Sequence, residues 1–171
     1  MTDSEIIGVR DRAFVVDTDD GRASWVDGTL VMDRVIAKCT DGAYAVVEQH
    51  APSGYAVPSH VNHGEKEIRY LLSGELGVTT AGESFGVTAG QTLVLKRGEP
   101  HGWRVTSEEP ARMLVFLSPP GFEECYHAAG RSATRRTLPE VAETSDEFLT
   151  RLPAYDVELL EERRSSRADA G

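Results

Sequence analysis

The stretch from Gly54 to Gly74 gathers side chains that bind metal ions or transfer protons. They are His60, Asn62, His63, Glu65 and Glu67. His60 and Asn62 are two positions apart, so on a strand they project from the same face. A short turn at Gly64 then brings Glu67 back towards them, because glycine permits tight turns. This spacing predicts a metal site built on a β-scaffold.

A second stretch, from Gly90 to Trp103, has the form of a hairpin. An apolar strand leads into a Gly/Pro turn, and His101 opens the next apolar segment. His101 is therefore expected beside the first cluster. His60, Glu67 and His101 together supply two nitrogens and one carboxylate, a ligand set that leaves coordination positions open on a divalent Fe, Ni, Mn or Zn ion.

Both stretches resemble the two sequence motifs of the cupins. The first motif is matched at Gly54, His60, Glu67 and Gly74, with Asn62 where the family has a second histidine. The second motif is matched at Gly90, Gly98 and His101, with Lys96 and Val105 in place of the family's proline and asparagine. The resemblance extends over about residues 25–158, and the segments 42–48 and 119–123 look like those of quercetinase-like monocupins.

This resemblance implies a flavonol-dioxygenase-like oxygenase whose substrate enolate binds at an open position of the metal ion. It also implies that Glu67 is either a ligand or the acceptor of the substrate's hydroxyl proton. His101 is the second candidate catalytic residue. The resemblance further implies a homodimer that packs through its sheet faces.

Asn62 leaves three interpretations open. Its amide oxygen is a weak fourth ligand or holds a metal-bound water, since a carboxamide is a poorer donor than imidazole. Alternatively His63 or Glu65 replaces it, or the site has lost its metal and become a binding pocket. His63 has the opposite strand parity from His60 and points away from the cavity unless a bulge intervenes.

The substrate pocket is predicted from strand parity. Trp103 and Val105 share the face of His101, and Arg69 and Leu71 share that of Glu67. Trp103 is equally consistent with plain core packing. An inward Arg69 needs a partner, either a carboxylate such as Glu67 or Glu48 or an anionic substrate; otherwise it faces outward. No function is assigned to His50, or to His127, which is expected on the surface of a late helix.

Composition restricts the partners. The 171 residues carry a formal net charge of −10, which opposes binding to nucleic acid. We expect no membrane partner and a cytoplasmic location, because the sequence shows neither an N-terminal signal pattern nor an apolar run of about twenty residues. Cys39 and Cys125 lie far apart and predict no disulfide framework.

Short strands and turns alternate every eight to ten residues, which favours an antiparallel sandwich or closed barrel over a layered α/β fold. Together with this pattern, the resemblance implies an all-β fold class, a cupin or jelly-roll antiparallel barrel with short C-terminal helices. Residues 1–20 are an arm or edge strand, 21–120 the barrel, 121–160 a helical appendage and 161–171 a disordered tail.

The candidate site predicts a metal-dependent small-molecule enzyme, and the resemblance implies a quercetinase-like dioxygenase that acts on an enolic or aromatic, flavonol- or polyketide-like substrate. The alternatives are a non-oxidative cyclase, isomerase or dehydratase of secondary metabolism, and a metal-free cupin that only binds a small ligand.

Overall fold

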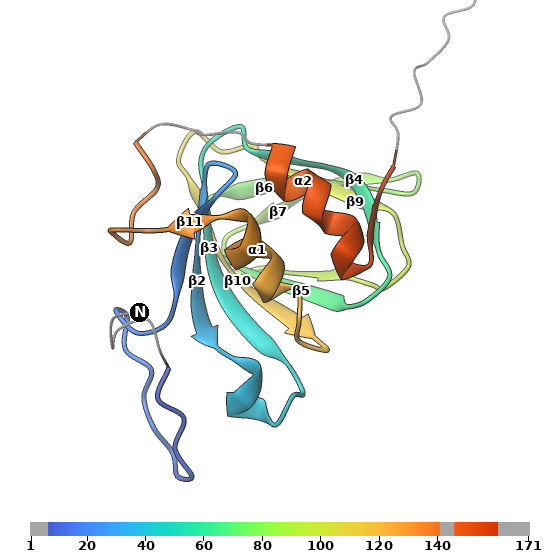
Figure 1. The fold of residues 1–171 in the computed structure, drawn as a ribbon. Coiled ribbons are helices and arrows are strands. Elements are labelled where there is room, and N and C mark those ends of the chain that lie inside the picture. Colours follow the sequence, from blue (N-terminus) through green and yellow to red (C-terminus); the bar gives the residue numbers. More distant parts are fainter. Residues whose placement is uncertain (1–6, 141–145, 161–171) are drawn as a thin grey trace, which may run out of the picture.

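The chain forms two antiparallel sheets that enclose one core (Figure 1), in a computed structural model that describes residues 7–140 and 146–160. The larger sheet has the order β11-β1-β2-β3-β10-β5-β8, and the smaller has the order β12-β4-β9-β6-β7. The strands are β1 Ala23–Val26, β2 Thr29–Val35, β3 Ala45–Ala51, β4 Ala56–Asn62, β5 Lys66–Ser73, β6 Glu75–Thr80, β7 Ser84–Thr88, β8 Thr92–Leu95, β9 His101–Val105, β10 Ala111–Ser118, β11 Arg131–Ser132 and β12 Val157–Leu159. The predicted barrel with short C-terminal helices is therefore confirmed.

Strand alternation places the site residues inside the barrel. In β5, Glu67, Arg69 and Leu71 are buried, whereas Ile68 and Tyr70 between them are exposed. This two-residue period follows from the pleat, which points successive side chains to opposite faces of a sheet. The core between the sheets is apolar at its centre, so the polar side chains at its open end are unusual and mark the site.

Gly74 of the first motif has a structural reason to be glycine. It follows β5 with φ of 84°, in the left-handed region that side chains rarely adopt. A Cβ atom there would lie 2.7 Å from the Cα of Ala111. The close approach of β10 to this hairpin therefore requires a residue without a side chain.

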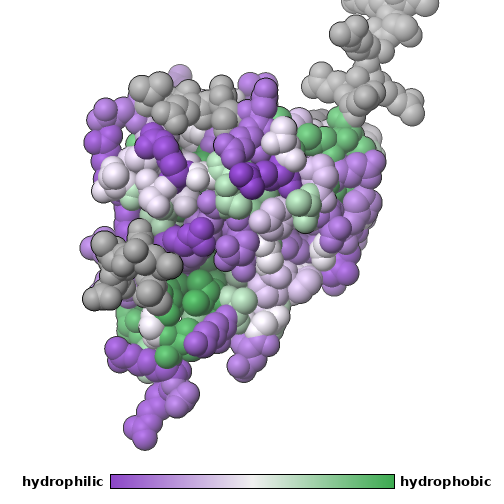
Figure 2. Space-filling model, in the orientation of Figure 1, coloured by the Kyte–Doolittle hydropathy of each residue, from purple (hydrophilic) through white to green (hydrophobic). Residues whose placement is uncertain are grey.

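Two helices cover the open end of the barrel. They are α1 (Glu123–Ala129) and α2 (Asp146–Arg151), and α2 continues into a 3₁₀ turn at Leu152–Tyr155. A second 3₁₀ turn, Ala37–Thr40, precedes β3. Figure 2 shows that the outer face of this region is mostly hydrophilic, so the helices turn their apolar sides inward onto the barrel. No helix among residues 7–140 and 146–160 is both long and apolar enough to cross a bilayer.

His127 fixes α1 to the larger sheet. The expectation of a surface position was wrong, since His127 is only 6% exposed. Its Nδ1 is 2.8 Å from Oγ of Ser24, and its Nε2 is 2.7 Å from Oδ1 of Asp33. A buried imidazole needs such partners because an unpaired polar group in the core is destabilising.

The two ends of the chain are described only in part. Residues 7–20 form no strand in the single chain, and Val15 is 85% exposed. From the predicted helical appendage, β12 pairs with β4, so this segment also adds a strand to the smaller sheet. Residues 1–6 of the arm and the predicted tail, 161–171, lie outside the described residues.

Candidate functional site

Two histidines meet at the end of the smaller sheet. His60 on β4 and His101 on β9 are paired across the strands, with ring centroids 4.3 Å apart. The Nδ1 atom of His60 lies 2.8 Å from the carbonyl oxygen of Pro58, and that of His101 lies 3.0 Å from the carbonyl oxygen of Glu99. Because a carbonyl oxygen only accepts, each Nδ1 carries the hydrogen, and each Nε2 of the neutral ring keeps a lone pair.

The surroundings of His60 and His101 leave their Nε2 atoms free to bind a ligand or accept a proton. Burial lowers the pKa of His60, which favours its neutral form. The Nε2 atom of His101 is buried, and no hydrogen-bond partner for it exists among the described residues. A buried polar atom without a partner is rare and points to a group that binds there.

Glu67 and Arg69 form a buried ion pair on the opposite sheet. Each is 4% exposed, and Nε of Arg69 donates to Oε1 of Glu67. Burial acts to lower the pKa of Arg69, but the adjacent Glu67 carboxylate outweighs it and the pKa is raised, so the guanidinium stays charged. Arg69 also donates to Oε1 of Gln49 at 2.9 Å and stacks 4.6 Å from the ring centroid of Trp103.

Asn62 stabilises the turn between β4 and β5. Its Oδ1 accepts the backbone N–H groups of Gly64 and Glu65, at 3.0 and 2.9 Å. Its amide nitrogen is 3.5 Å from the Glu65 carboxylate. Both lone pairs of the carboxamide oxygen are therefore directed at the turn, as in other asparagine-stabilised turns.

Glu65 connects this turn to the helices. It is 7% exposed, and its Oε1 accepts the backbone N–H of Phe122 at 2.7 Å. Burial raises the pKa of Glu65 to about 7, although the hydrogen bonds from Phe122 and Asn62 act to lower it. His63, by contrast, lies on the surface, where its Nε2 is 2.9 Å from the carboxylate of Glu158.

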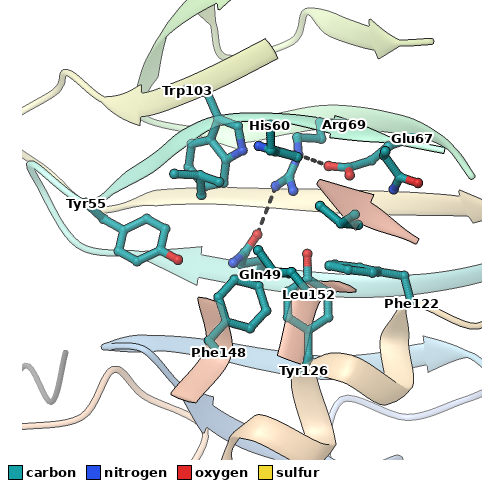
Figure 3. A pocket seen from close by; sticks show the side chains of 13 residues that line it. Gln49, Tyr55, His60, Glu67, Arg69, Trp103, Phe122, Tyr126, Phe148 and Leu152 are labelled. Carbon is teal, nitrogen blue, oxygen red and sulfur yellow. Dashed lines mark hydrogen bonds and ion pairs between the residues drawn. The ribbon is translucent and has the colours of Figure 1, made fainter. Parts of the chain in front are cut away.

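His60, Asn62, Glu67 and Arg69 line a pocket, whereas His101, Glu65 and His63 do not (Figure 3). The lining residues come from both sheets and both helices: Gln49, Tyr55, Val57, His60, Asn62, Glu67, Arg69, Trp103, Phe122, Tyr126, Phe148, Leu152 and Val157. The free volume is about 30 Å³, which is room for about two water molecules. The aromatic rings of Phe122, Tyr126 and Phe148 pack on one another and occupy the rest of the space.

The predicted pocket residues divide into two groups. Arg69 and Trp103 line the pocket, with Arg69 inward and paired with Glu67. Leu71 and Val105 share the predicted strand faces but belong to the hydrophobic core and do not line the pocket. They lie one step further along the strands, where side chains from both sheets fill the barrel.

Sequence reasoning missed the residues that complete the pocket. Gln49 lies between Glu48 and His50 in β3, and the available signal was strand parity, because Gln49 shares the buried face of Val47 and Ala51. The spacing of Phe122 and Tyr126 is compatible with one side of a short helix, but nothing in it indicates that this side covers the barrel. Tyr55, Phe148 and Leu152 were not identified, because their role depends on how distant elements pack.

The geometry gives a test of whether the predicted ligands fit a metal ion. His60 and His101 lie together with free Nε2 lone pairs, as a metal site requires. The carboxylate of Glu67, however, is held by Arg69, and the oxygen of Asn62 is directed at the turn. Within the described residues, no group of three or more His, Cys, Asp or Glu side chains is arranged to hold a metal ion. The donor set as arranged therefore does not fit a three-ligand ion, and the metal site stays a prediction.

Comparison with known proteins finds similarity to cupins. Residues 46–117 match the family model described as Cupin domain, and the two-sheet barrel is a cupin fold. Quercetin 2,3-dioxygenase of Bacillus subtilis (strain 168) is 26% identical over 133 residues, which are 75% of this chain and 39% of that protein. Polyketide synthase CurC of Streptomyces cyaneus is 33% identical over 66 residues, 39% of this chain and 43% of that protein. This chain thus spans about two fifths of the length of these relatives.

Solved structures agree with this fold. A predicted oxalate decarboxylase of Thermotoga maritima superposes with a TM-score of 0.55 at 20% identity, over 63% of this chain and 100% of that one. KdgF from Halomonas sp. gives a TM-score of 0.56 at 16% identity, over 66% and 99% of the two chains. At these identities the likeness concerns the fold alone.

Proposed function

We propose that this chain is a small-molecule enzyme that performs acid–base chemistry on an enolic, polyketide-like substrate in the barrel pocket. The observation that carries the proposal is the Glu67–Arg69 ion pair, buried beside neutral His60 and against the face of Trp103. In this ion pair, Glu67 is a proton acceptor and Arg69 is a fixed cation, and both are buried away from water. Such a pair suits the formation of an enolate, whose negative charge needs a permanent positive partner.

Glu67 takes the proton in this reaction. The O–H bond of the substrate enol breaks, the proton moves to a carboxylate oxygen of Glu67, and the electron pair stays on the substrate as an enolate. The net charge of the closed pocket does not change, because the enolate replaces the carboxylate as the partner of Arg69. Keeping charge balanced in a low-dielectric site lowers the barrier to the transfer.

Ring closure follows without any further reactant. The enolate carbon attacks a second carbonyl of the same substrate, a C–C bond forms, and the carbonyl π electrons become an alkoxide. The proton held by Glu67 then moves to this alkoxide and restores the carboxylate. When water is subsequently lost, the neutral Nε2 of His60 removes the neighbouring C–H proton, the C–H electron pair forms the new C=C bond as the C–O bond breaks, and the imidazolium returns this proton to the leaving hydroxide, so that water departs and His60 is neutral again.

Trp103 and Tyr55 provide the binding surface for a planar substrate. Their rings pack at a centroid distance of 5.6 Å, and both line the pocket. Aromatic walls favour flat, conjugated ligands over sugars or small acids. The similarity to polyketide synthase CurC, although it covers only 39% of this chain, supports a polyketide-like substrate class.

A second candidate function is a quercetinase-like dioxygenase with a divalent metal ion. The match to quercetin 2,3-dioxygenase over 75% of this chain favours it, as does the buried Nε2 of His101. A third is a cupin that binds a small ligand without turnover. Both compete with the acid–base proposal for the same pocket.

Mass analysis of products made under nitrogen separates these functions. The assay incubates the protein with linear poly-β-ketones and with flavonols, with and without air. We expect a product of the same mass as the substrate, or lighter by one water, formed equally in both atmospheres. Glu67→Gln and Arg69→Met should abolish it, whereas Arg112→Met, which changes an exposed arginine on the outer face of β10, should not. A product that has gained two oxygen atoms only in air would instead establish the dioxygenase.

A further inference from the structure

We infer that the guanidinium of Arg69 takes the place of a metal ion as the partner of Glu67 and so prevents a divalent ion from binding in the pocket. Glu67, the carboxylate of the predicted ligand set, already has a cationic partner two residues along the same strand. A metal ion bound to Glu67 would lie beside a charge of the same sign, 4% exposed to solvent and unable to lose its proton.

Arg69 cannot easily move aside to admit a metal ion. Its terminal nitrogen Nη1 donates to Oε1 of Gln49 at 2.9 Å and contacts the sulfur of Met113 at 3.1 Å, and the guanidinium stacks on the ring of Trp103. Contacts from three other strands therefore hold the guanidinium in the centre of the pocket. Buried arginines with this many partners are fixed structural charges rather than mobile ones.

Asn62, the fourth predicted ligand, is also engaged in other contacts. Where a histidine would offer a ring nitrogen, Asn62 directs its oxygen at two backbone N–H groups of the turn. Of the four predicted ligands, the two histidines keep a free ring nitrogen, Asn62 is engaged, and Glu67 has one carboxylate oxygen paired with the guanidinium, so a third ligand would have to be shared with Arg69. Divalent Zn and Fe are held in catalytic sites by at least three protein ligands.

The inference predicts that a chain without the Arg69 guanidinium can bind a metal ion in this pocket. Removing the guanidinium frees the Glu67 carboxylate, and a histidine at position 62 adds an imidazole two residues from His60 on the same strand face. The Asn62→His/Arg69→Met double variant should therefore bind a divalent ion that the wild-type chain does not hold. The inference is compatible with the acid–base reaction and with ligand binding alone, and it excludes the metal-dependent dioxygenase.

The test is elemental analysis after loading with Zn²⁺ or Fe²⁺ under nitrogen and removal of free metal. We expect metal far below one ion per wild-type chain and a melting temperature that added Zn²⁺ leaves unchanged. The double variant should hold close to one ion per chain and melt at a higher temperature with Zn²⁺, and adding His101→Ala should abolish both effects. Asn62→His/Arg112→Met is the matched control and should stay metal-free.

Near-stoichiometric metal in the wild-type chain that His101→Ala removes would overturn the inference, whether or not the double variant folds. This outcome is separate from the fate of the proposed reaction, which is judged by products rather than by metal content. If the wild-type chain holds metal and still forms its product under nitrogen, the exclusion of metal by Arg69 is wrong but the proposed reaction stands. A metal-free wild type with no product would overturn only the reaction.

Discussion

Glu65 and Phe122 are 57 positions apart in the chain, yet the backbone N–H of Phe122 donates to Oε1 of Glu65 at 2.7 Å. This contact joins the β4–β5 turn, which positions His60 and Glu67, to the first residue of the helical cover. The pocket walls and the catalytic candidates are therefore coupled through one buried carboxyl group. Its protonation state should be visible in the stability of the whole domain.

The first prediction concerns the pH dependence of that stability. Burial raises the pKa of Glu65 from 4.5 to about 7, so the folded chain binds a proton more tightly than the unfolded chain. The free energy of unfolding should consequently fall as pH rises from 4.5 to 7. Glu65→Gln, which keeps an acceptor for Phe122, should remove this decrease and stabilise the protein above pH 7 by up to about 3 kcal/mol.

Urea denaturation of wild type and Glu65→Gln at several pH values between 4 and 8 checks this prediction. The control is Glu83→Gln, which changes an exposed carboxylate after β6. If the wild type and Glu65→Gln differ by the same amount at pH 4 and pH 8, Glu65 does not titrate as expected.

The second prediction concerns Glu48 on β3, whose contribution to the free energy of unfolding should have the opposite pH dependence to that of Glu65. A hydrogen bond with His50 is the largest cause that lowers the pKa of Glu48 to about 2; burial opposes it, and Arg112 and Arg34 add to the lowering. The folded chain thus holds the carboxylate form. Its stabilisation is complete above pH 4.5 and is lost as pH falls towards 2.

Glu48→Gln should therefore destabilise the fold at pH 7 by about 3 kcal/mol, with the difference from wild type shrinking below pH 4.5. Chemical denaturation at pH 7, 4 and 3 measures this difference. A constant difference across these pH values would contradict the ion-pair cluster as its source.

The third prediction concerns the size of the pocket. A free volume of about 30 Å³ cannot hold a multi-ring substrate, so side chains of the helical cover must move when one binds. Leu152 is 2% exposed and lines the pocket, and Leu152→Ala should leave space there. We expect tighter binding of large planar ligands and a loss of about 2–5 kcal/mol in the free energy of unfolding.

Fluorescence titration with quercetin, beside thermal denaturation, measures both effects. Leu149→Ala is the matched control, because Leu149 is a half-buried leucine of α2 that does not line the pocket. Equal changes in affinity for the two variants would show that the helix as a whole, rather than the space at Leu152, governs binding.

The sequence was informative about the barrel and about which residues face inward. The structure places His60, Glu67, Arg69 and Trp103 around the pocket and His101 beside His60, on the strand faces that alternation assigns to them. These are local properties, since the pleat alone decides which face a residue takes.

The partners of the inward residues were not predictable in the same way. The choice of Arg69 between Glu67, Glu48 and the solvent depends on contacts with Gln49, Met113 and Trp103 from three other strands. The burial of His127 likewise depends on Ser24 and Asp33, about a hundred residues away. Such contacts are set by tertiary packing, which a periodic pattern does not encode.

The fourth prediction concerns assembly and starts from the outer face of the larger sheet. Neighbouring strands there expose apolar side chains in register: Ile68 opposes Val94 on β8 and Phe116 on β10, and Tyr70 opposes Leu114. Tyr70 and Leu72 are 39% and 40% exposed. Contiguous exposed apolar surface of this kind is typical of an interaction site.

We propose a second copy of this chain as the occupant of that face. The charged margin of this face is already neutralised by the Glu48 contacts with Arg34 and Arg112, so two copies can pack through it without burying an unpaired charge. Light scattering during gel filtration should give twice the chain mass of 18.7 kDa for the wild type. Tyr70→Lys should give the monomer mass, because it places a charge at the centre of the isologous contact. Phe85→Lys, at an exposed aromatic residue of β7 in the other sheet, should remain dimeric. A monomeric wild type, or dissociation by Phe85→Lys alone, would contradict pairing through this sheet.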